Sequence, residues 1–327
     1  SRDLLVVGQS AVALLLLVGA LLVLRSVRAL LDVPAGFDPN GVVVARFWMP
    51  QPNDPASGPY FRHEQRLPFY RRVLERIEAM PGVERAGFAS ALPLADRRNL
   101  LGMLIEGRPV ESVDTVTAQM TLASPGYFEA MRIGLASGRP LLDSDDERAP
   151  GVVVVNEAFA RKYFAGDDPV GRRVRPGGRQ STAPWLTIVG VVRDVRADGL
   201  DKEPPPQLYR AMFQASTLQF ALVVRAQTDA ATLGRAITRE VRAVDGDLPV
   251  FGVRPLADVV DRSLGQRRLA MQLLGVFAGA AVLLAALGLY GVMSYYVGLR
   301  RTELGVRLAV GATPFDIGRM VLARGAG

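Results

Sequence analysis

The segment VVVVNEAFARKYF, residues 152–164, shows how this chain alternates between two kinds of secondary structure. Its four consecutive valines predict a short buried β-strand. Asn156 then fits the N-cap of a helix that continues to Phe164, because an Asn side chain accepts the unpaired N–H groups of a first helical turn. Another strand is predicted over 186–195. This alternation predicts a mixed α/β subdomain.

Further α/β units flank this subdomain on both sides. In each, a β-rich run is followed by an amphipathic helix and a second β-rich run, which predicts a β-α-β unit. In the later unit, Leu233, Ile237 and Val241 recur at helical spacing and are expected to face the core. The predicted elements are strands at 41–49, 83–90, 220–225 and 250–253, and helices at 66–80 and 230–244. The section from about 96 to 217 is therefore expected to be an inserted subdomain.

Two stretches without Asp, Glu, Lys or Arg, residues 4–24 and 269–299, bracket these units. A helix needs roughly 20 apolar residues to cross a membrane, so both stretches predict membrane spans. The alternative for either is a buried helix of a soluble protein. The first also resembles a signal peptide, but no small-residue cleavage site follows it. Helical spacing continues over 25–31 and, beginning with a first-turn proline, over 255–268. We expect these two segments to be stalk helices, the first of them ended by Pro34 and Gly36.

The charges beside the second stretch predict the orientation of the chain. Basic residues exceed acidic ones after position 299, which is typical of the cytoplasmic side of a membrane. The segment between the stretches is then extracytoplasmic. The predicted fold class is membrane α-helical spans plus an α+β extracytoplasmic domain. Its predicted divisions are 1–31 (first span and stalk), 32–262 (extracytoplasmic domain), 263–299 (stalk end and second span) and 300–327 (cytoplasmic segment).

Both ends of the sequence suggest a fragment. The chain begins at Ser1 rather than Met, and an apolar segment is beginning again where it ends. We therefore expect it to be part of a longer protein with several membrane spans.

The composition offers little for catalysis. The chain has no Cys and a single histidine, His63, so thiolate metal sites and two-histidine zinc motifs such as H-E-x-x-H are excluded. His63 is expected to be a solvated loop residue. The net charge of +7 does not predict nucleic-acid binding, because Lys162 and Lys202 are the only lysines among 39 basic residues. That composition indicates genomic base bias. No enzyme activity, metal or bound cofactor is predicted.

Two loops have the composition of ligand sites without the spacing. Residues 166–171 have the glycine spacing of a phosphate-binding loop, but Arg172 and Arg173 stand where such a loop has Lys and Ser or Thr. An acidic cluster lacks the regular spacing of a Ca²⁺ loop, so we expect a solvated turn. The cluster consists of Asp143, Asp145, Asp146 and Glu147.

The segment after the second stretch predicts two helices joined by a tight turn. Glu303 precedes Arg307 by four residues, which favours a pair on a helix surface. Gly311 fits the left-handed residue at a helix C-terminus. Thr313 then begins the sequence TPFD, in which a capping residue and a first-turn proline start another helix. An inert juxtamembrane linker is the alternative.

These residues carry a resemblance to a known family. The segment RTELGVRLAVGA, residues 301–312, resembles the signature of MacB/FtsX-type ABC transporter permeases. Residues 124–131, 154–164, 188–195 and 287–295 are similar to that family's outer domain and second span. Residues 6–26 most resemble the start of the second half of a duplicated orphan permease.

The resemblance implies a periplasmic core of two subdomains in a multi-pass inner-membrane protein. It implies that a separate cytoplasmic ABC ATPase subunit uses ATP, that the lipid bilayer surrounds the spans, and that the chain forms a dimer or a pseudo-dimer with the other half of a longer chain. No nucleic acid is implied. The positions that match the ATPase-coupling region are Arg301, Glu303, Gly305, Arg307, Gly311, Ala312, Thr313, Pro314 and Asp316.

A two-span membrane receptor with an extracytoplasmic ligand-sensing domain shares the predicted topology. Such a receptor continues into paired heptad helices or a signalling domain, whereas a permease continues into further spans. Residues 300–327 favour the permease.

Overall fold

The computed structural model describes residues 33–50, 58–96, 100–109, 116–263 and 265–299, with Val18, Gly19, Leu22 and Arg25. Two compact units divide the chain: Val33–Leu264, which we call the α/β unit, and the remainder. The predicted first span, apart from four residues, and the predicted segment 300–327 lie outside the described residues. The predicted domain boundaries remain predictions.

The first half of the α/β unit is a four-stranded sheet with two helices. Its order is β11-β1-β10-β2, and each neighbouring pair is antiparallel. β1 is therefore parallel to β2 across β10, and β10 is parallel to β11 across β1, so the two predicted β-α-β units interleave. The elements are β1 (Val42–Trp48), α2 (His63–Glu78), β2 (Val83–Ala89), β10 (Gln219–Ala226), α5 (Ala230–Val244) and β11 (Val250–Pro255).

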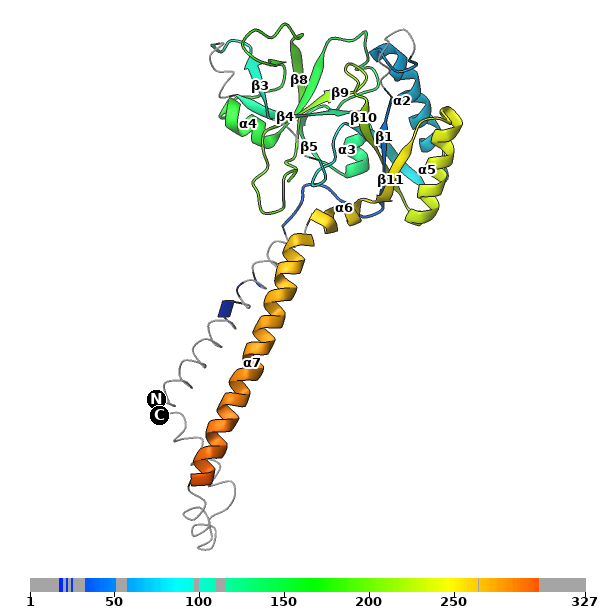
Figure 1. Ribbon diagram of the computed structural model, residues 1–327. Coiled ribbons are helices and arrows are strands. Elements are labelled where there is room, and N and C mark those ends of the chain that lie inside the picture. The colour runs from blue at the N-terminus through cyan, green and yellow to red at the C-terminus, as the bar shows by residue number, and fades with distance from the viewer. Residues whose placement is uncertain are drawn as a thin grey trace. The chain divides into compact units, whose positions relative to one another are not determined.

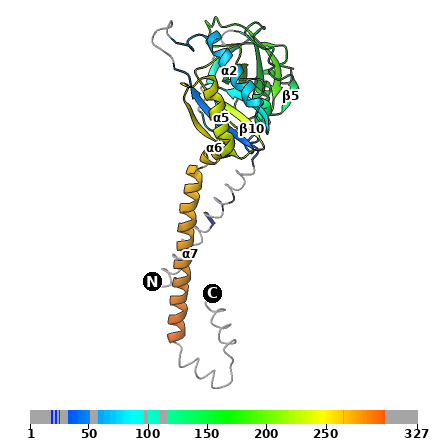
Figure 2. The same ribbon diagram turned by 90° about the vertical axis from the view of Figure 1, so that its right-hand side faces the viewer.

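Helices α2 and α5 contact each other on one face of this sheet (Figure 2). The predicted helix at 230–244 is confirmed, and its inward residues Leu233, Ile237 and Val241 are buried. Between helices and sheet, the rings of Phe47 and Phe220 stack with centroids 5.1 Å apart. Burial of such large apolar rings supplies most of the stabilisation of a core of this kind.

The second half is a closed barrel. Strand pairing runs β3-β4-β9-β6-β8-β7 and returns from β7 to β3, so each of these six strands has two partners within the ring. Closure leaves no exposed strand edge. The strands are β3 (Leu100–Ile105), β4 (Thr117–Ala123), β6 (Val152–Asn156), β7 (Arg173–Pro176), β8 (Leu186–Val192) and β9 (Gln207–Ala211), and β5 (Leu135–Gly138) pairs with β8 outside the ring.

Helix α4 (Glu157–Phe164) completes the core of the barrel with Phe159, Tyr163 and Phe164. Asn156 caps this helix as predicted, because its Oδ1 accepts the N–H of Phe159 at 3.0 Å. Strand β8 ends at Val192, three residues earlier than predicted. The residues after Val192 leave the sheet and contact the segment that precedes β1 instead.

The two halves share one sheet and one of the three hydrophobic clusters that the described residues form. β2 and β4 pair at Ala89 and Ala123, which joins the barrel to the first sheet (Figure 1). A hydrophobic cluster draws residues from both halves, from α3 (Tyr127–Met131) and from α6 (Leu256–Ser263). The inserted section therefore packs as part of the α/β unit.

Two helices replace the single stalk helix predicted over 255–268. Pro255 ends β11 and does not begin a helix; α6 follows, and α7 (Gly265–Leu299) begins after it. α7 has 35 residues. A search of the described part of the chain finds no helix with the length and apolar character of a membrane span.

Candidate functional site

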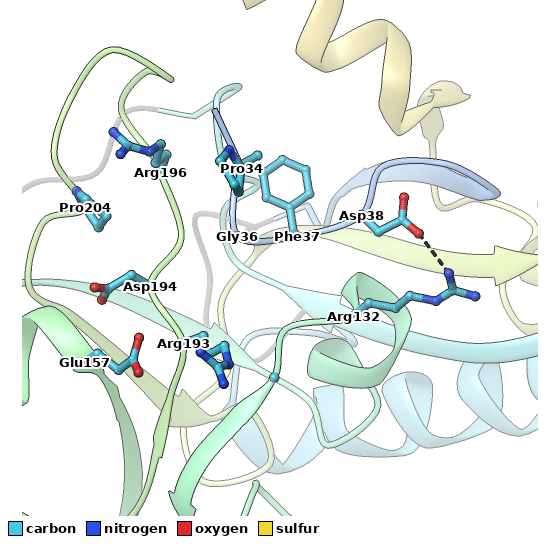
Figure 3. Close-up of a pocket in the computed structure, with 12 residues that line it drawn as sticks. Pro34, Gly36, Phe37, Asp38, Arg132, Glu157, Arg193, Asp194, Arg196 and Pro204 are labelled. Carbon is cyan, nitrogen blue, oxygen red and sulfur yellow. Dashed lines mark hydrogen bonds and ion pairs between the residues drawn. The ribbon is translucent and has the colours of Figure 1, made fainter. Parts of the chain in front are cut away.

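A cleft of about 570 Å³ opens on the α/β unit beside the segment that leads into β1 (Figure 3). We call this segment, residues 33–40, the strap. The other walls are the turn after α3, the first residue of α4 and the loop after β8. The charged residues of the lining are Asp38, Arg132, Glu157, Arg193, Asp194 and Arg196.

On one side, the strap lies directly against the loop after β8. The backbone N–H of Arg196 donates to the carbonyl oxygen of Ala35 at 3.0 Å. Gly36 has φ +84°, and a Cβ on it would lie 1.9 Å from the backbone oxygen of Asp194. Only glycine combines this backbone conformation with so close an approach.

On the other side, the buried guanidinium of Arg225 holds the strap. It donates to the backbone oxygens of Asp38 at 2.7 Å, Asn40 at 2.7 Å and Ala130 at 2.8 Å. The N–H of Asp38 also donates to the carbonyl of Met131 at 3.0 Å. Because Arg225 lies on β10, these bonds fix the strap to the first sheet and to α3.

The charges around Asp38 stabilise its ionised form. Burial by itself raises the pKa of this carboxyl, but the N–H of Asn40 and the guanidinium groups of Arg225 and Arg132 outweigh it, so the pKa is lowered. Arg132 donates to Asp38 at 2.9 Å. Burial lowers the pKa of the Arg225 guanidinium, and the nearby charge of Arg132 acts in the same direction. Both groups remain charged at neutral pH.

Asp194 connects the loop after β8 to the start of α4. Its Oδ1 accepts the side-chain amide of Asn156 at 2.8 Å and the N–H of Ala158 at 2.7 Å, and its Oδ2 accepts Arg161 at 2.6 Å. Asn156 also accepts the N–H of Gln207 at 2.8 Å. The strap thus touches a loop that is tied to α4 and, through Asn156, to the start of β9.

Two charged groups of the cleft remain available. Within the described residues, the side chains of Arg193 and Glu157 make no hydrogen bond or ion pair with the protein. The stem of Arg193 lies over Gly134, where an added Cβ would be 3.3 Å from Arg193 Cδ. In Figure 3, Glu157 lies beside Asp194, and the side chain of Arg193 lies between Glu157 and Arg132.

Comparison with known families identifies the relationship of this chain. The model of the MacB-like periplasmic core domain matches residues 5–244. The chain belongs to this family. The matched family is a periplasmic domain, and the match includes no ATPase domain.

Relatives of this MacB-like chain are permeases of ABC transporters. The macrolide export ATP-binding/permease protein MacB of Aggregatibacter actinomycetemcomitans is 22% identical over 200 residues, which are 58% of this chain and 30% of MacB. The uncharacterized ABC transporter permease YknZ of Bacillus subtilis is 20% identical over 278 residues, 84% of this chain and 65% of YknZ. The chain therefore spans less than a third of the length of that MacB protein.

Among solved structures, the periplasmic region of MacB from Actinobacillus actinomycetemcomitans aligns with a TM-score of 0.45 and 13% identity. The alignment covers 72% of this chain and 98% of that one.

The residues predicted to couple this MacB-like chain to an ATPase, from Arg301 to Asp316, all lie outside the described residues. The residues that form the cleft were not predicted as a site, because their arrangement depends on contacts between distant segments. The sequence singled out Pro34 and Gly36 among them, but predicted only that these two residues end a helix.

His63 is not the solvated loop residue that the sequence predicted. It is the first residue of α2, and its Nε2 lies 3.2 Å from the carbonyl oxygen of Phe213. A carbonyl only accepts, so Nε2 carries the proton and Nδ1 accepts from Ser216, whose Oγ is 2.8 Å away. His63 therefore ties α2 to the segment before β10.

The acidic cluster is also not a simple solvated turn. Asp145 is 4% exposed and forms a two-bond pair with Arg139, at 2.7 and 2.8 Å. Asp146 and Glu147 lie 3.8 and 3.2 Å from Arg71 on α2. Among the described residues, no group of His, Cys, Asp or Glu is arranged to hold a metal ion.

The glycine loop at 166–171 forms a backbone hydrogen bond with a strand of the barrel half. The N–H of Gly171 donates to the carbonyl of Ile188 at 2.8 Å. This N–H is therefore not available to a phosphate group.

Proposed function

We propose that this chain is part of the permease subunit of a MacB/FtsX-type ABC transporter, acting in efflux or mechanotransmission. A separate cytoplasmic ATPase subunit hydrolyses ATP, and the permease passes the resulting movement to its periplasmic α/β unit. The chain itself binds no cofactor. The names of its relatives, which include export and permease proteins, support this assignment.

The attachment of the strap is the observation that carries the mechanical part of the proposal. Arg225 fixes the strap to the first sheet, and the contacts of Gly36 and Arg196 fix it to the loop after β8. A displacement of the chain before residue 33 is therefore passed to both halves of the α/β unit at once. A loosely attached linker would absorb that displacement.

The membrane part of the proposal rests on the amino-acid sequence. We place spans at 4–24 and 269–299, with the tail in the cytoplasm and the α/β unit in the periplasm or outside the cell. α7 leaves large apolar side chains exposed to solvent. The exposed fractions of Val276, Phe277 and Leu283 are 70%, 61% and 66%. Lipid or neighbouring spans would cover such side chains.

Coupling to the ATPase is assigned to the segment after α7. The residues concerned are Arg301, Glu303, Gly305, Arg307, Gly311, Ala312, Thr313, Pro314 and Asp316. The partner permease copy, or the other half of a longer chain, would complete the transporter as a dimer or pseudo-dimer.

Topology is tested by labelling single cysteines in the full-length protein with a membrane-impermeant thiol reagent in intact spheroplasts. Ser144→Cys is suitable because Ser144 is exposed and makes no side-chain contact within the described residues. We expect labelling at Ser144→Cys and none at Thr313→Cys until the membrane is opened. Labelling of Thr313→Cys alone would overturn the proposed orientation.

Mechanical coupling is tested in the full-length protein reunited with its ATPase. Arg225→Lys keeps the charge but removes the planar fork that binds three carbonyls, so we expect normal insertion and ATPase binding with loss of transport. The matched control is Arg172→Lys, because Arg172 is exposed and its side chain makes no contact within the described residues. Transport that survives Arg225→Lys would contradict the mechanical role of the strap.

A further inference from the structure

The cleft beside the strap contains one cation and one carboxylate that the protein does not use. Asp194 is saturated by Asn156, Ala158 and Arg161, and Asp38 is bound by Arg132. Arg196 donates to the carbonyl oxygens of Leu200 and Lys202. Within the described part of the chain, this leaves Arg193 and Glu157 as the cleft's charged groups without a partner.

We propose that the cleft binds a phosphate ester that carries an ammonium group, the chemistry of a phosphoethanolamine headgroup. Arg193 pairs with the phosphate, and Glu157 pairs with the ammonium group. A guanidinium forms two parallel hydrogen bonds to a phosphate, which makes this pairing stronger than one to a neutral acceptor.

Arg193 is positioned before any ligand arrives. Its backbone N–H donates to the carbonyl of Gly134 at 2.8 Å, and its stem rests on Gly134, where no side chain intervenes. A side chain held in this way loses less conformational freedom on binding than a free surface arginine. The exposed guanidinium lies at the cleft (Figure 3).

The start of α4 does not compete for the anion. Helix N-termini attract anions, but the N–H of Ala158 already donates to Asp194, and the N–H of Phe159 donates to Asn156. Glu157 adds a negative charge on the same side. A ligand with only a negative charge would be repelled by Glu157. A ligand that also carries an ammonium group can pair with Arg193 and with Glu157.

The rest of the lining favours a headgroup with an apolar extension. Pro34, Phe37 and Pro204 provide apolar surface beside the charged groups. This choice of source rests on the proposed function: in the proposed topology, only residues 25–32 separate the first span from the strap. Phospholipid headgroups are concentrated at the surface of the membrane that this span would cross.

The test is calorimetric titration of the purified full chain in a phosphate-free maltoside detergent. The probes are glycerophosphoethanolamine, dihexanoyl phosphatidylethanolamine, glycerophosphoglycerol and inorganic phosphate. We expect both ethanolamine probes to bind more tightly than the two that lack an ammonium group. Tighter binding of the dihexanoyl probe supports the lipid source, and equal binding of both ethanolamine probes rejects that source while supporting the ligand chemistry.

Variants separate the two charges. Arg193→Gln is expected to weaken binding of all four probes, by about tenfold for the ethanolamine probes. Glu157→Gln is expected to weaken only the probes with an ammonium group, and Arg172→Gln, the exposed control, to change nothing. No binding by the wild type, or equal binding by Arg193→Gln and Arg172→Gln, would overturn the proposal.

The outcome is independent of the topology test. Headgroup binding with reversed cysteine labelling would keep the ligand site and remove the proposed orientation. Correct labelling without binding would remove the ligand site alone.

Discussion

Gly36 and Asp194 lie so close that a single added carbon would place Cβ 1.9 Å from a backbone oxygen. The two residues belong to segments more than 150 positions apart, the strap and the loop after β8. Their contact brings the start of the α/β unit against the barrel half and forms one wall of the cleft. Any side chain at position 36 has to displace one of these two backbones.

Gly36→Ala is therefore expected to destabilise the protein well beyond the cost of its backbone conformation. Gly107 provides the matched control, because its φ of +82° is close to the +84° of Gly36. An added Cβ at Gly107 would have no atom within 4 Å, whereas one at Gly36 would clash. We expect Gly107→Ala to cost about 1 kcal/mol and Gly36→Ala about 3 kcal/mol or more. Chemical denaturation of the full chain in detergent measures both, and equal losses would show that the strap moves away easily.

The sequence predicted local elements of this fold well, but not the cleft. The helix at 230–244 was predictable because Leu233, Ile237 and Val241 carry a periodic signal within one short segment. Closure of the barrel depends on pairings such as that of β4 with β9, between segments far apart in the chain. No local pattern specifies such pairings, so Arg193, Asp194 and Gly36 carried no recognisable site signal.

Asn156 was predicted as a helix cap and has a larger role in the structure. It is fully buried. Its Oδ1 accepts the N–H groups of Phe159 and Gln207. Its side-chain amide donates to the carboxylate of Asp194 and to the carbonyl oxygen of Pro205. Asn156→Ala leaves several of these buried groups unpaired, each at about 1–3 kcal/mol. We expect a total loss of about 3 kcal/mol or more in the free energy of unfolding.

The control for this prediction is the cap of α5. The exposed side chain of Asp229 accepts the N–H of Thr232 at 2.9 Å, and it also accepts from the Thr232 side chain and the N–H of Ala231. Asp229→Ala is expected to cost about 1 kcal/mol. If the two alanine variants unfold at the same denaturant concentration, Asn156 acts as a cap and nothing more.

The lowered pKa of Asp145 predicts how the stability of the protein depends on pH. Burial raises the pKa of this carboxyl, but the hydrogen bonds from Arg139 and from the N–H of Leu142 outweigh burial and lower the pKa from its usual 3.8. The unfolded chain therefore takes up this proton at a higher pH than the folded chain does. The stabilisation is fully present above pH 3.8 and is lost as the pH falls through the lowered value.

Asp145→Asn should accordingly lower the melting temperature at pH 7, and the difference from the wild type should narrow below pH 3.8. Thermal unfolding of the full chain across the acid range provides the measurement. Asp167→Asn is the control, since Asp167 is exposed and its side chain has no partner among the described residues; we expect a change within about 0.5 kcal/mol at every pH. Parallel curves for Asp145→Asn and wild type throughout would contradict the assignment.

The last prediction concerns the turn after α7, which lies outside the described residues and rests on sequence. If Gly311 adopts a left-handed conformation between two short helices, Gly311→Val is strongly strained, because a β-branched residue rarely adopts positive φ. Leu308→Val introduces the same side chain within the predicted helix and is expected to be mild. Exchanging the charges of Glu303 and Arg307 should disturb the surface offered to the ATPase while preserving the helix.

In the full-length protein with its ATPase, Gly311→Val and the charge exchange should insert normally but bind the ATPase poorly, or lose coupling of hydrolysis to transport. Membrane fractionation checks insertion, co-purification checks binding, and hydrolysis assays with and without the permease check coupling. Leu308→Val should retain all three properties. Wild-type coupling and transport in both test variants would identify the segment as an inert linker, because a surface that receives movement from an ATPase does not tolerate both a distorted turn and reversed charges.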